Sequence, residues 1–494
     1  VKSATLIKDD LLNTETTSTD VLYGLDDRPP PVRSVVLALQ HVLTMFGSTV
    51  AVPLMLGPPM GMDTGQIAVL ISSVMLCSGV ATLIQATFGS RLPIIQGVSF
   101  SFLAAFFMII AAVHPEGSDA EAGAAMPYIA GAVMVGACLE MVVGFSGAMA
   151  WLRRVLSPVV VGPVIMLIGL ALYEAGAPIA ASHWPVAILT MALIAVFSFV
   201  LSTKHVVFRM FPMLLAIVVA VTVCGLGAAA GLFGPDHPSR PNLSAFTSAP
   251  WIRTTDIVFP WGLPKFDTSF IIAVMAGYLA SMIESFGDYH ACKQMAGAGD
   301  PTEQEISRGL GCEGLACALT GVLGGFSSTS YSENVGLIGL TRVGSRFVVQ
   351  VGAVLLILLG LFGKFGALAA AIPTPVVGGL YCAMFGLISA VGIRQFARAD
   401  LASDRNLFIG GFALFMGISV QHYFKNGGAD DAAQALPSVI ASVVSALGQT
   451  GMAVAAVLGI LLDNLIPGTD AERGLQTESP QPTNSPPPSG ASTP

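Results

Sequence analysis

Long apolar stretches, separated by short polar ones, run through this sequence from residue 33 to residue 465. Most of them are close to the roughly 20 residues that a helix needs to cross the hydrocarbon core of a bilayer. We predict fourteen membrane spans, at 33–53, 66–88, 92–112, 124–150, 155–176, 184–203, 210–233, 268–290, 306–324, 328–343, 347–371, 374–395, 405–424 and 434–465. A polar, proline-rich loop at 234–265 divides these spans into two sets of seven.

The stretch Gly324–Arg346 is the least membrane-like part of this apolar region. Six consecutive residues, Ser327 to Ser332, carry hydroxyl groups, and Glu333 and Asn334 follow directly. Irregular polar backbone is tolerated at membrane depth only where protein buries it or where it lines a watery cavity. Secondary transporters hold substrates and ions at discontinuous helices of this kind, so we expect the substrate site here.

An odd number of spans in each half places the two halves in opposite orientations, which predicts an inverted repeat with its site at the bilayer midplane. A weak internal similarity agrees with this. A Gly-Ala-Val triplet precedes a Pro-Val-Val run in each half, at Gly131 and Pro158 and again at Gly352 and Pro375. The third span then corresponds to the tenth, and both are short, polar and glycine-bearing, which predicts a pair of broken helices.

Composition supports the membrane class. The 494 residues are 54% hydrophobic and 11% charged, whereas soluble domains carry about 25% charged residues. We therefore predict an all-α polytopic membrane protein. No basic cluster points to nucleic acid, and the seven cysteines form neither a CxxC pair nor a Cys/His cluster that would suggest a metal site.

Charge placement predicts the orientation in the membrane. With the N-terminus inside, 17 of the 22 Lys and Arg residues fall in the cytoplasm, and the exceptions are Arg240, Arg253, Lys265, Lys364 and Lys425. Positive charge concentrates on the cytoplasmic side of membrane proteins, so both termini are predicted to lie in the cytoplasm, at the plasma membrane. The acidic N-terminal segment lacks the charge-then-apolar order of a signal peptide. The predicted parts are a disordered tail at 1–31, a first repeat at 32–233, the loop at 234–265, a second repeat at 266–466 and a disordered tail at 467–494.

Glu284 and Asp288 are the first candidates for chemistry, because ionisable residues inside a membrane are costly and usually functional. They lie four residues apart in the eighth span, on one face of a helix. Two carboxylates this close in a low dielectric do not both ionise readily, so one of them can load and release a proton as access alternates. Capping or pairing near the cytoplasmic end of the helix is the alternative role for Asp288.

Glu333 follows Tyr331 and Ser332 at the expected start of a half-helix. Its carboxylate can accept two N–H groups from a planar ring while nearby backbone amides and the preceding side chains meet the ring carbonyls. Helix capping is the alternative for Glu333, and the two roles are compatible. Asn334 either bonds the substrate or braces the break, and bracing is favoured.

Four further polar or aromatic residues are placed near the site. Gln40 and His41 in the first span are expected to orient it, and Ser99 and Phe100 lie at the break of the third span. Phe100 can stack on a planar ring, although packing is the commoner role of such an aromatic. Two more acids within spans, Glu140 and Glu313, are assigned to structural pairing.

The run Glu333-Asn334-x-Gly336-x4-Thr341-Arg342 resembles the signature of the nucleobase–ascorbate transporter family, (Gln/Glu/Pro)-Asn-x-Gly-x4-Thr-(Arg/Lys/Gly). The first-span Gln-His pair, the third-span break, the eighth-span acids and the Ile-Pro-x-Pro run near residue 372 extend this resemblance over most of 33–424.

The resemblance implies two inverted repeats of seven spans. Spans 1–4 and 8–11 would form a core domain that slides like an elevator against a gate domain of spans 5–7 and 12–14, and the gate would form a homodimer. By carry-over onto matching positions, Glu284 and Glu333 would grip a base, with Phe100 and the backbone near Ser332 completing the site.

The resemblance also bears on the substrate. The first signature position is proline in ascorbate-type members and glutamate or glutamine in nucleobase-type members, so Glu333 favours a nucleobase. A carboxylate would also repel ascorbate, which is an anion at neutral pH. Asp288 stands where uracil-type bacterial members have histidine, which leaves uracil and xanthine-like purines both open.

These observations predict a nucleobase symporter without a cofactor, coupled to a proton, with sodium as the alternative ion. An ascorbate:sodium symporter is the first alternative function. A sulfate/bicarbonate-type anion transporter of the same architecture is disfavoured by the carboxylates at the site. A membrane enzyme is excluded because the sequence shows no nucleophile–base pair and its loops are too short for a catalytic domain.

Overall fold

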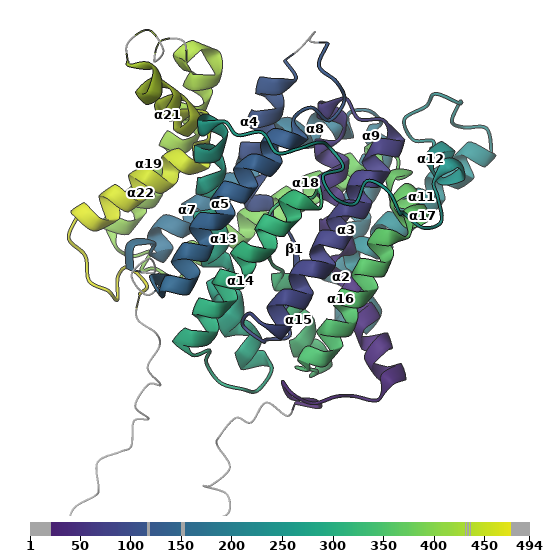
Figure 1. The fold of residues 1–494 in the computed structure, drawn as a ribbon, viewed down its shortest axis with the longest axis horizontal. Coiled ribbons are helices and arrows are strands. Elements are labelled where there is room, and N and C mark those ends of the chain that lie inside the picture. Colours follow the sequence, from purple (N-terminus) through teal and green to yellow (C-terminus); the bar gives the residue numbers. More distant parts are fainter. Residues whose placement is uncertain are drawn as a thin grey trace, which may run out of the picture.

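The computed structural model describes residues 21–475 apart from 116–118, 150–153, 430, 432–433 and 435. Of the tails predicted at 1–31 and 467–494, residues 1–20 and 476–494 lie outside the described residues. Within the described part, the fold consists of helices around one small two-stranded sheet (Figure 1).

The first half of the chain forms the following elements, in order: α2 (Pro31–Leu56), η1 (Pro58–Met60), α3 (Thr64–Thr87), β1 (Gln96–Val98), η2 (Phe100–Phe102), α4 (Leu103–Val113), α5 (Met126–Ser146), α7 (Pro158–Ala171), α8 (Tyr173–Ala180), α9 (Trp184–Ala195), η3 (Val196–Val200), η4 (Leu201–Thr203), α10 (Val206–Met210), α11 (Pro212–Ala229) and α12 (Ser244–Ser248). The second half forms α13 (Thr268–Met295), α14 (Glu303–Val322), β2 (Ser328–Ser330), α15 (Ser332–Thr341), α16 (Arg346–Leu361), α17 (Gly363–Ala370), α18 (Thr374–Phe396), α19 (Asp404–Tyr423), η5 (Phe424–Gly428), α21 (Ser438–Gly448) and α22 (Gly451–Leu465).

Local sequence signals explain where several of these helices begin. A capping box joins Asp63 and Gln66 at the start of α3, and another joins Thr302 and Glu305 at the start of α14. Each box satisfies backbone N–H groups that have no partner within the helix. Proline occupies the first turn of α2, α7, α11 and α18, where its missing N–H costs nothing.

Nine helices in the described part are long and apolar enough to cross a membrane, and the bent pair α16–α17, with a bend of 78°, raises the number to ten. Each of the fourteen predicted stretches contains helix. However, α4, α15, α21 and α22 are short, and α14 is not among the nine. A membrane protein with many spans is therefore confirmed, while the count of fourteen and the inverted repeat stay predictions.

The helices pack in two groups. In the first, α3 packs on α16 and α17, and α5 packs on α13 and α14; in the second, α18 packs on α7, α8 and α9, and α19 packs on α7 and α22. Glycines allow the closest approaches in the first group: a Cβ on Gly79 would lie 2.7 Å from the carbonyl oxygen of Ala353, and one on Gly144 would lie 2.3 Å from the amide nitrogen of Gly311. In lipid there is no hydrophobic driving force that brings helices together, and small residues let their backbones approach closely enough to pack tightly.

The two predicted broken spans meet in the middle of the fold, where β1 lies between α13 and α3 in Figure 1. The strands β1 and β2 pair antiparallel, with Gln96 opposite Ser330 and Val98 opposite Ser328. Each strand is followed by a short helix, α15 directly and α4 after the turn η2. This pairing gives hydrogen-bond partners to backbone N–H and C=O groups that are not part of any helix. Backbone groups within a membrane need such partners, because no water is available there.

The inner parts of the predicted tails are held against the helices. The backbone N–H of Leu22 donates to the carbonyl oxygen of Arg342 at 2.8 Å, and Arg473 forms a 2.7 Å ion pair with Asp463 of α22. Residues 21–31 and 467–475 therefore have defined positions next to the membrane spans.

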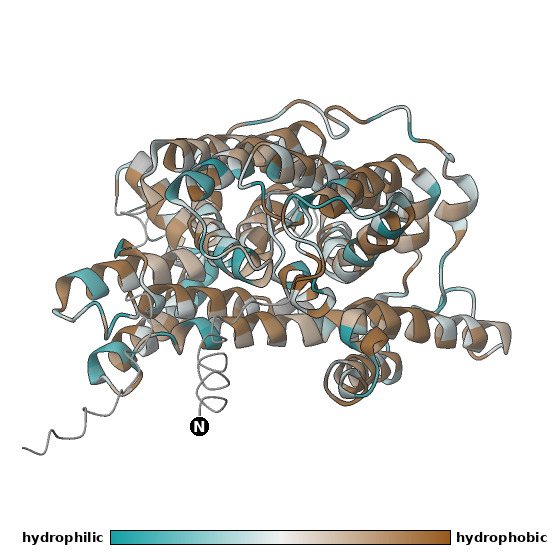
Figure 2. Cartoon of the chain, turned by 90° about the horizontal axis from the view of Figure 1, so that it is seen from below, coloured by the Kyte–Doolittle hydropathy of each residue, from teal (hydrophilic) through white to brown (hydrophobic). Residues whose placement is uncertain are grey.

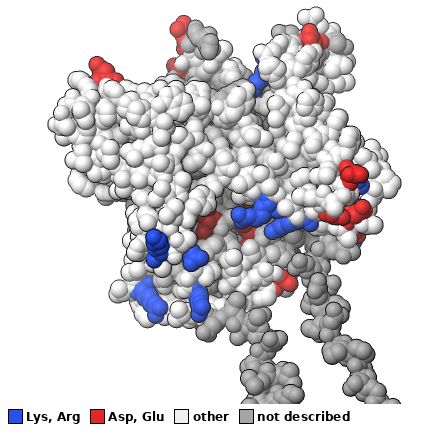
Figure 3. Space-filling model, turned by 180° about the vertical axis from the view of Figure 1, so that it is seen from behind, with Lys and Arg blue, Asp and Glu red and all other residues white. Residues whose placement is uncertain are grey.

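The molecular surface has the character of a membrane protein. Apolar residues cover most of the helix lengths in Figure 2, and large side chains such as Phe145, Phe199 and Phe415 are exposed on them. On the face drawn in Figure 3, Lys and Arg side chains gather in the lower part, while Asp and Glu predominate at the upper edge. Apolar flanks between two differently charged ends suit a protein that lies across a bilayer.

Candidate substrate-binding site

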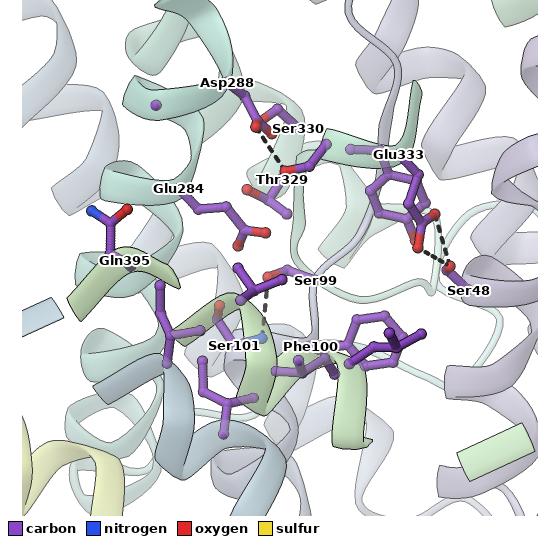
Figure 4. Close-up of a pocket in the computed structure, with 18 of the residues that line it drawn as sticks. Ser48, Ser99, Phe100, Ser101, Glu284, Asp288, Thr329, Ser330, Glu333 and Gln395 are labelled. Atoms are coloured by element: carbon purple, nitrogen blue, oxygen red, sulfur yellow. Dashed lines mark hydrogen bonds between the residues drawn. The ribbon is translucent and has the colours of Figure 1, made fainter. Parts of the chain in front are cut away.

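A cavity of about 480 Å³ lies between the two groups of helices, a volume suited to a small organic molecule. Its polar wall comes from the middle of α13 in the first group, from α2, which packs on α3 and α16 of that group, and from the segments that follow β1 and run from β2 into α15. Its opposite wall is mostly apolar and comes from α7, α11 and α18. Residues more than 200 positions apart therefore face one another across the cavity (Figure 4).

The two acids of α13 both line the cavity. Asp288 is 7% exposed, and its two oxygens accept hydrogen bonds of 2.7 Å from Ser330 and Ser332. Asp288 lies two turns before the end of α13, so its contacts are with the hydroxyl run and not with the end of its own helix. Glu284 lies one turn earlier and points into the cavity in Figure 4.

Glu333 lies in the first turn of α15. Both of its oxygens accept from the hydroxyl of Ser48 on α2, at 2.9 Å each. One donor therefore fixes the orientation of the carboxylate and leaves both oxygens with acceptor capacity for a ligand. The sequence reasoning missed Ser48, because an isolated serine in an apolar helix carries no distinguishing signal.

The turn after β1 forms another part of the wall. The hydroxyl of Ser99 accepts from the backbone N–H of Ser101 at 3.2 Å and caps the short helix η2. Phe100 is half-buried and lines the cavity. An aromatic face and three carboxylates thus surround one space.

Asn334, His41 and Gln40 do not line the cavity. The side-chain amide of Asn334 donates to the carbonyl oxygen of His41 at 2.9 Å and lies 3.2 Å from its Nδ1. These contacts connect α15 to α2 beside the site. Tyr331 lines the cavity, but its hydroxyl donates to the carbonyl oxygen of Val98 at 2.9 Å and so braces the strand pair.

The cavity is strongly acidic. Its lining includes Glu284, Asp288 and Glu333, and no described Lys or Arg forms an ion pair with any of them. Arg394 and Arg398, near the end of α18, are the only cationic residues that the described part of the chain contributes to the lining. Asp288 is buried, Glu284 is half-buried and Glu333 is exposed to the cavity. Three neighbouring carboxylates without an ion-paired cation among the described residues repel one another, so this site suits protons, cations or a ligand rich in N–H donors.

Residues 32–426 match the xanthine/uracil permease family model, which is described as a permease family. The chain is also 35% identical to the Homo sapiens protein "Solute carrier family 23 member 2", over 92% of this chain and 76% of that protein. It is 34% identical to "Nucleobase-ascorbate transporter 2" of Arabidopsis thaliana, over 82% of this chain and 80% of that protein. The chain belongs to the nucleobase–ascorbate transporter family. The resemblance carried by the Glu333–Arg342 signature is thereby confirmed.

As a member of the nucleobase–ascorbate transporter family, the protein is a membrane transporter and not an enzyme. Its fold is similar to the transmembrane domain of a cyanobacterium bicarbonate transporter, BicA, with a TM-score of 0.50 and 13% identity over 88% of this chain and 99% of that one. It is also similar to the murine anion transporter "Solute Carrier 26 family member A9" in its inward-facing state, with a TM-score of 0.56 and 10% identity over 94% and 74% of the two chains. At such low identity these likenesses show a shared fold alone.

Proposed function

We propose that this protein is a secondary active transporter that imports a nucleobase, either uracil or a xanthine-like purine, together with a proton. The observation that carries the proposal is the cavity in which Glu284, Asp288 and Glu333 present acceptors and form no ion pair with any described Lys or Arg. Uracil and xanthine are planar rings with several N–H donors beside carbonyl oxygens. Hydrogen bonds from such donors to a carboxylate are among the stronger ones.

The geometry around Glu333 supports a role in gripping the base. Its two oxygens, oriented by Ser48, can each accept one ring N–H. Backbone N–H groups at the start of α15 lie in the same turn, where they can donate to a ring carbonyl. Phe100 from the other broken span offers a face for stacking.

The distribution of the cavity walls supports an elevator-like motion. The polar groups that would hold the base come from α2, α13, β2 and α15, whereas the facing wall from α7, α11 and α18 is mostly apolar. The elements that hold the substrate could therefore slide along α7, α11 and α18 without breaking hydrogen bonds, because this facing wall offers few hydrogen-bonding groups. The cavity extends to Arg394 and Arg398 near the end of α18, and the charge distribution predicts that both arginines lie on the cytoplasmic side. A cavity that reaches this side corresponds to an inward-facing state.

We further propose that the second group of helices forms a homodimer at the plasma membrane, with both termini in the cytoplasm. Large apolar side chains on the outer face of α19, including Phe408, Phe415 and Ile418, are exposed and provide a surface of the required kind. Cysteine cross-linking at these positions in native membranes tests the dimer, and monomeric protein under all conditions would refute it.

An ascorbate:sodium symporter is the second candidate, because the same three carboxylates could bind sodium ions whose charge would then admit an anion. Purified protein in proteoliposomes distinguishes the two candidates. Labelled uracil, xanthine and ascorbate are each offered with an inward proton gradient, with an inward sodium gradient and with neither. Uptake of a base driven by protons supports the proposal, whereas ascorbate uptake driven by sodium and no uptake of either base refutes it.

A further inference from the structure

Among the described residues, two completely buried acids lie outside the substrate cavity and, unlike Asp463, have no ion pair: Glu140 on α5 and Glu313 on α14. These helices pack closely on each other at the same level, where a Cβ on Gly314 would lie 2.7 Å from the backbone nitrogen of Met141. No described Lys or Arg forms an ion pair with either acid. The titratable groups that face the two acids are Tyr278, Tyr289, Cys317 and Glu284.

The two acids differ sharply in their hydrogen bonds. Both carboxyl oxygens of Glu140 lack a hydrogen-bond partner among the described residues. Glu313, in contrast, accepts from Ser285 at 2.6 Å and from Tyr289 at 2.7 Å. A buried charge without a donor is very costly, so the arrangement suits a neutral, protonated Glu140 beside an ionised Glu313.

A line of hydroxyl groups connects Glu313 to the substrate cavity. The hydroxyl of Ser285 lies 2.6 Å from Oε1 of Glu313 and 3.1 Å from the hydroxyl of Ser330. The hydroxyl of Ser330 lies in turn 2.7 Å from Oδ2 of Asp288. Both serines are completely buried, so water does not compete for these three links.

The proton count of this line is informative. Three hydrogen bonds in series need three hydrogens, and the two serine hydroxyls supply two. The third has to come from one of the two terminal carboxyl groups. The line is complete when either Asp288 or Glu313 is protonated, and these two states differ only in the direction of every hydrogen bond.

We propose that Asp288, Ser330, Ser285 and Glu313 form a proton relay that moves the coupled proton from the substrate cavity to a buried acid pair, Glu313 with Glu140. The inference rests on the proposed proton-coupled function and adds where that proton is stored. Glu140 keeps a resident proton, and Glu313 receives the transported one.

The transfer balances without any other reactant. The carboxyl O–H of Asp288 gives its proton to Ser330, Ser330 gives its own proton to Ser285, and Ser285 gives its own to the carboxylate of Glu313. Three O–H bonds break and three form, and Asp288 is left ionised in the cavity. An ionised Asp288 can then hydrogen-bond a substrate N–H while the proton remains out of its way, and the reverse transfer releases the proton.

The chain offers a matched set of variants on α13. Ser285→Ala removes the middle link, and Ser285→Thr keeps a hydroxyl there. Ser281→Ala is the control, because the hydroxyl of Ser281 lies 3.5 Å from the same oxygen of Glu313 but is not part of the line. Glu140→Gln removes the resident acid without touching the line.

Two measurements in proteoliposomes separate the relay from substrate binding. Base exchange across the membrane without a proton gradient reports binding and alternation, and an internal pH dye reports protons moved per base. A positioned proton transfer contributes about 10²–10⁴-fold, so Ser285→Ala should lose at least about tenfold in proton movement while exchange changes less than about twofold. Ser285→Thr should recover proton movement, and Ser281→Ala should match the wild type. Unchanged proton movement in Ser285→Ala overturns the relay.

Infrared spectroscopy tests the acid pair even if no base is transported. Substrate-free protein should show a protonated-carboxyl stretch that is lost in Glu140→Gln and kept in Ser281→Ala. A carboxyl band that changes with pH should also disappear in Glu313→Gln. A spectrum without a band that depends on Glu140 overturns the proposal, whereas failure of uptake by the wild type would refute the proposed function instead.

Discussion

Replacing Glu333 with glutamine is the sharpest single perturbation of the proposed site. The change removes the charge and converts one of the two oxygens from an acceptor into a donor. The fold should tolerate it, because the hydroxyl of Ser48 lies 2.9 Å from both oxygen positions and can either donate to an amide oxygen or accept from an amide nitrogen. The loss should therefore fall on the substrate.

The expected magnitude follows from the number of acceptors. Each hydrogen bond to a charged group contributes about 1.5–3 kcal/mol, and Glu333→Gln removes one acceptor and leaves a donor facing a ring N–H. A loss of about 1.5–3 kcal/mol corresponds to roughly 10- to 150-fold weaker binding of the base. We expect the KM for uracil or xanthine to rise by that factor.

The assay is initial-rate uptake into proteoliposomes, normalised to the amount of incorporated protein. Glu303→Gln is the matched control, because Glu303 is an exposed residue in the first turn of α14, outside the cavity, and its replacement should leave the KM unchanged. Ascorbate tests whether the effect is electrostatic: because Glu333→Gln removes a negative charge from the cavity, the affinity for this anion should rise while the affinity for the base falls. A Glu333→Gln protein whose KM for its base stays within about twofold of the wild type would refute the reasoning.

Three further predictions concern the strand pair, the relay entrance and a buried ion pair. Gly97→Ala would put a Cβ 2.4 Å from the ring of Tyr331, so we expect about 1–3 kcal/mol of destabilisation and a loss of uptake. Gly225→Ala is the control: a Cβ there would meet no atom within 4 Å outside its own stretch of helix, so this variant should melt like the wild type in detergent. Asp288→Asn should flatten the dependence of uptake on pH, and an unchanged pH profile would remove this acid from proton coupling. Asp463→Asn leaves two arginines without their buried carboxylate and should cost about 3–5 kcal/mol, measured by thermal unfolding; an unchanged melting temperature would contradict it.

The sequence alone was sufficient for the class, the approximate spans and the two polar interruptions. These features follow from local composition, since a run such as Ser327–Glu333 cannot face lipid wherever it lies in the fold. The signature beginning at Glu333 also identified the family before any contact was known. The apolar pattern does not fix the number of crossings, because helices such as α4 and α15 are apolar but too short to cross a membrane alone.

Only the tertiary structure decided which groups touch. Ser48 and Glu333 are 285 positions apart and Ser330 and Asp288 are 42 apart, and no local pattern encodes such pairings. The structure also placed Asn334 against His41 beside the cavity and turned the hydroxyl of Tyr331 towards Val98. Glu140 and Glu313 looked like a simple structural pair in the sequence. Their unequal hydrogen bonding, and the serine line to Asp288, arise only when α5, α13, α14 and β2 pack together, because side-chain hydrogen bonds depend on distances that sequence spacing does not set.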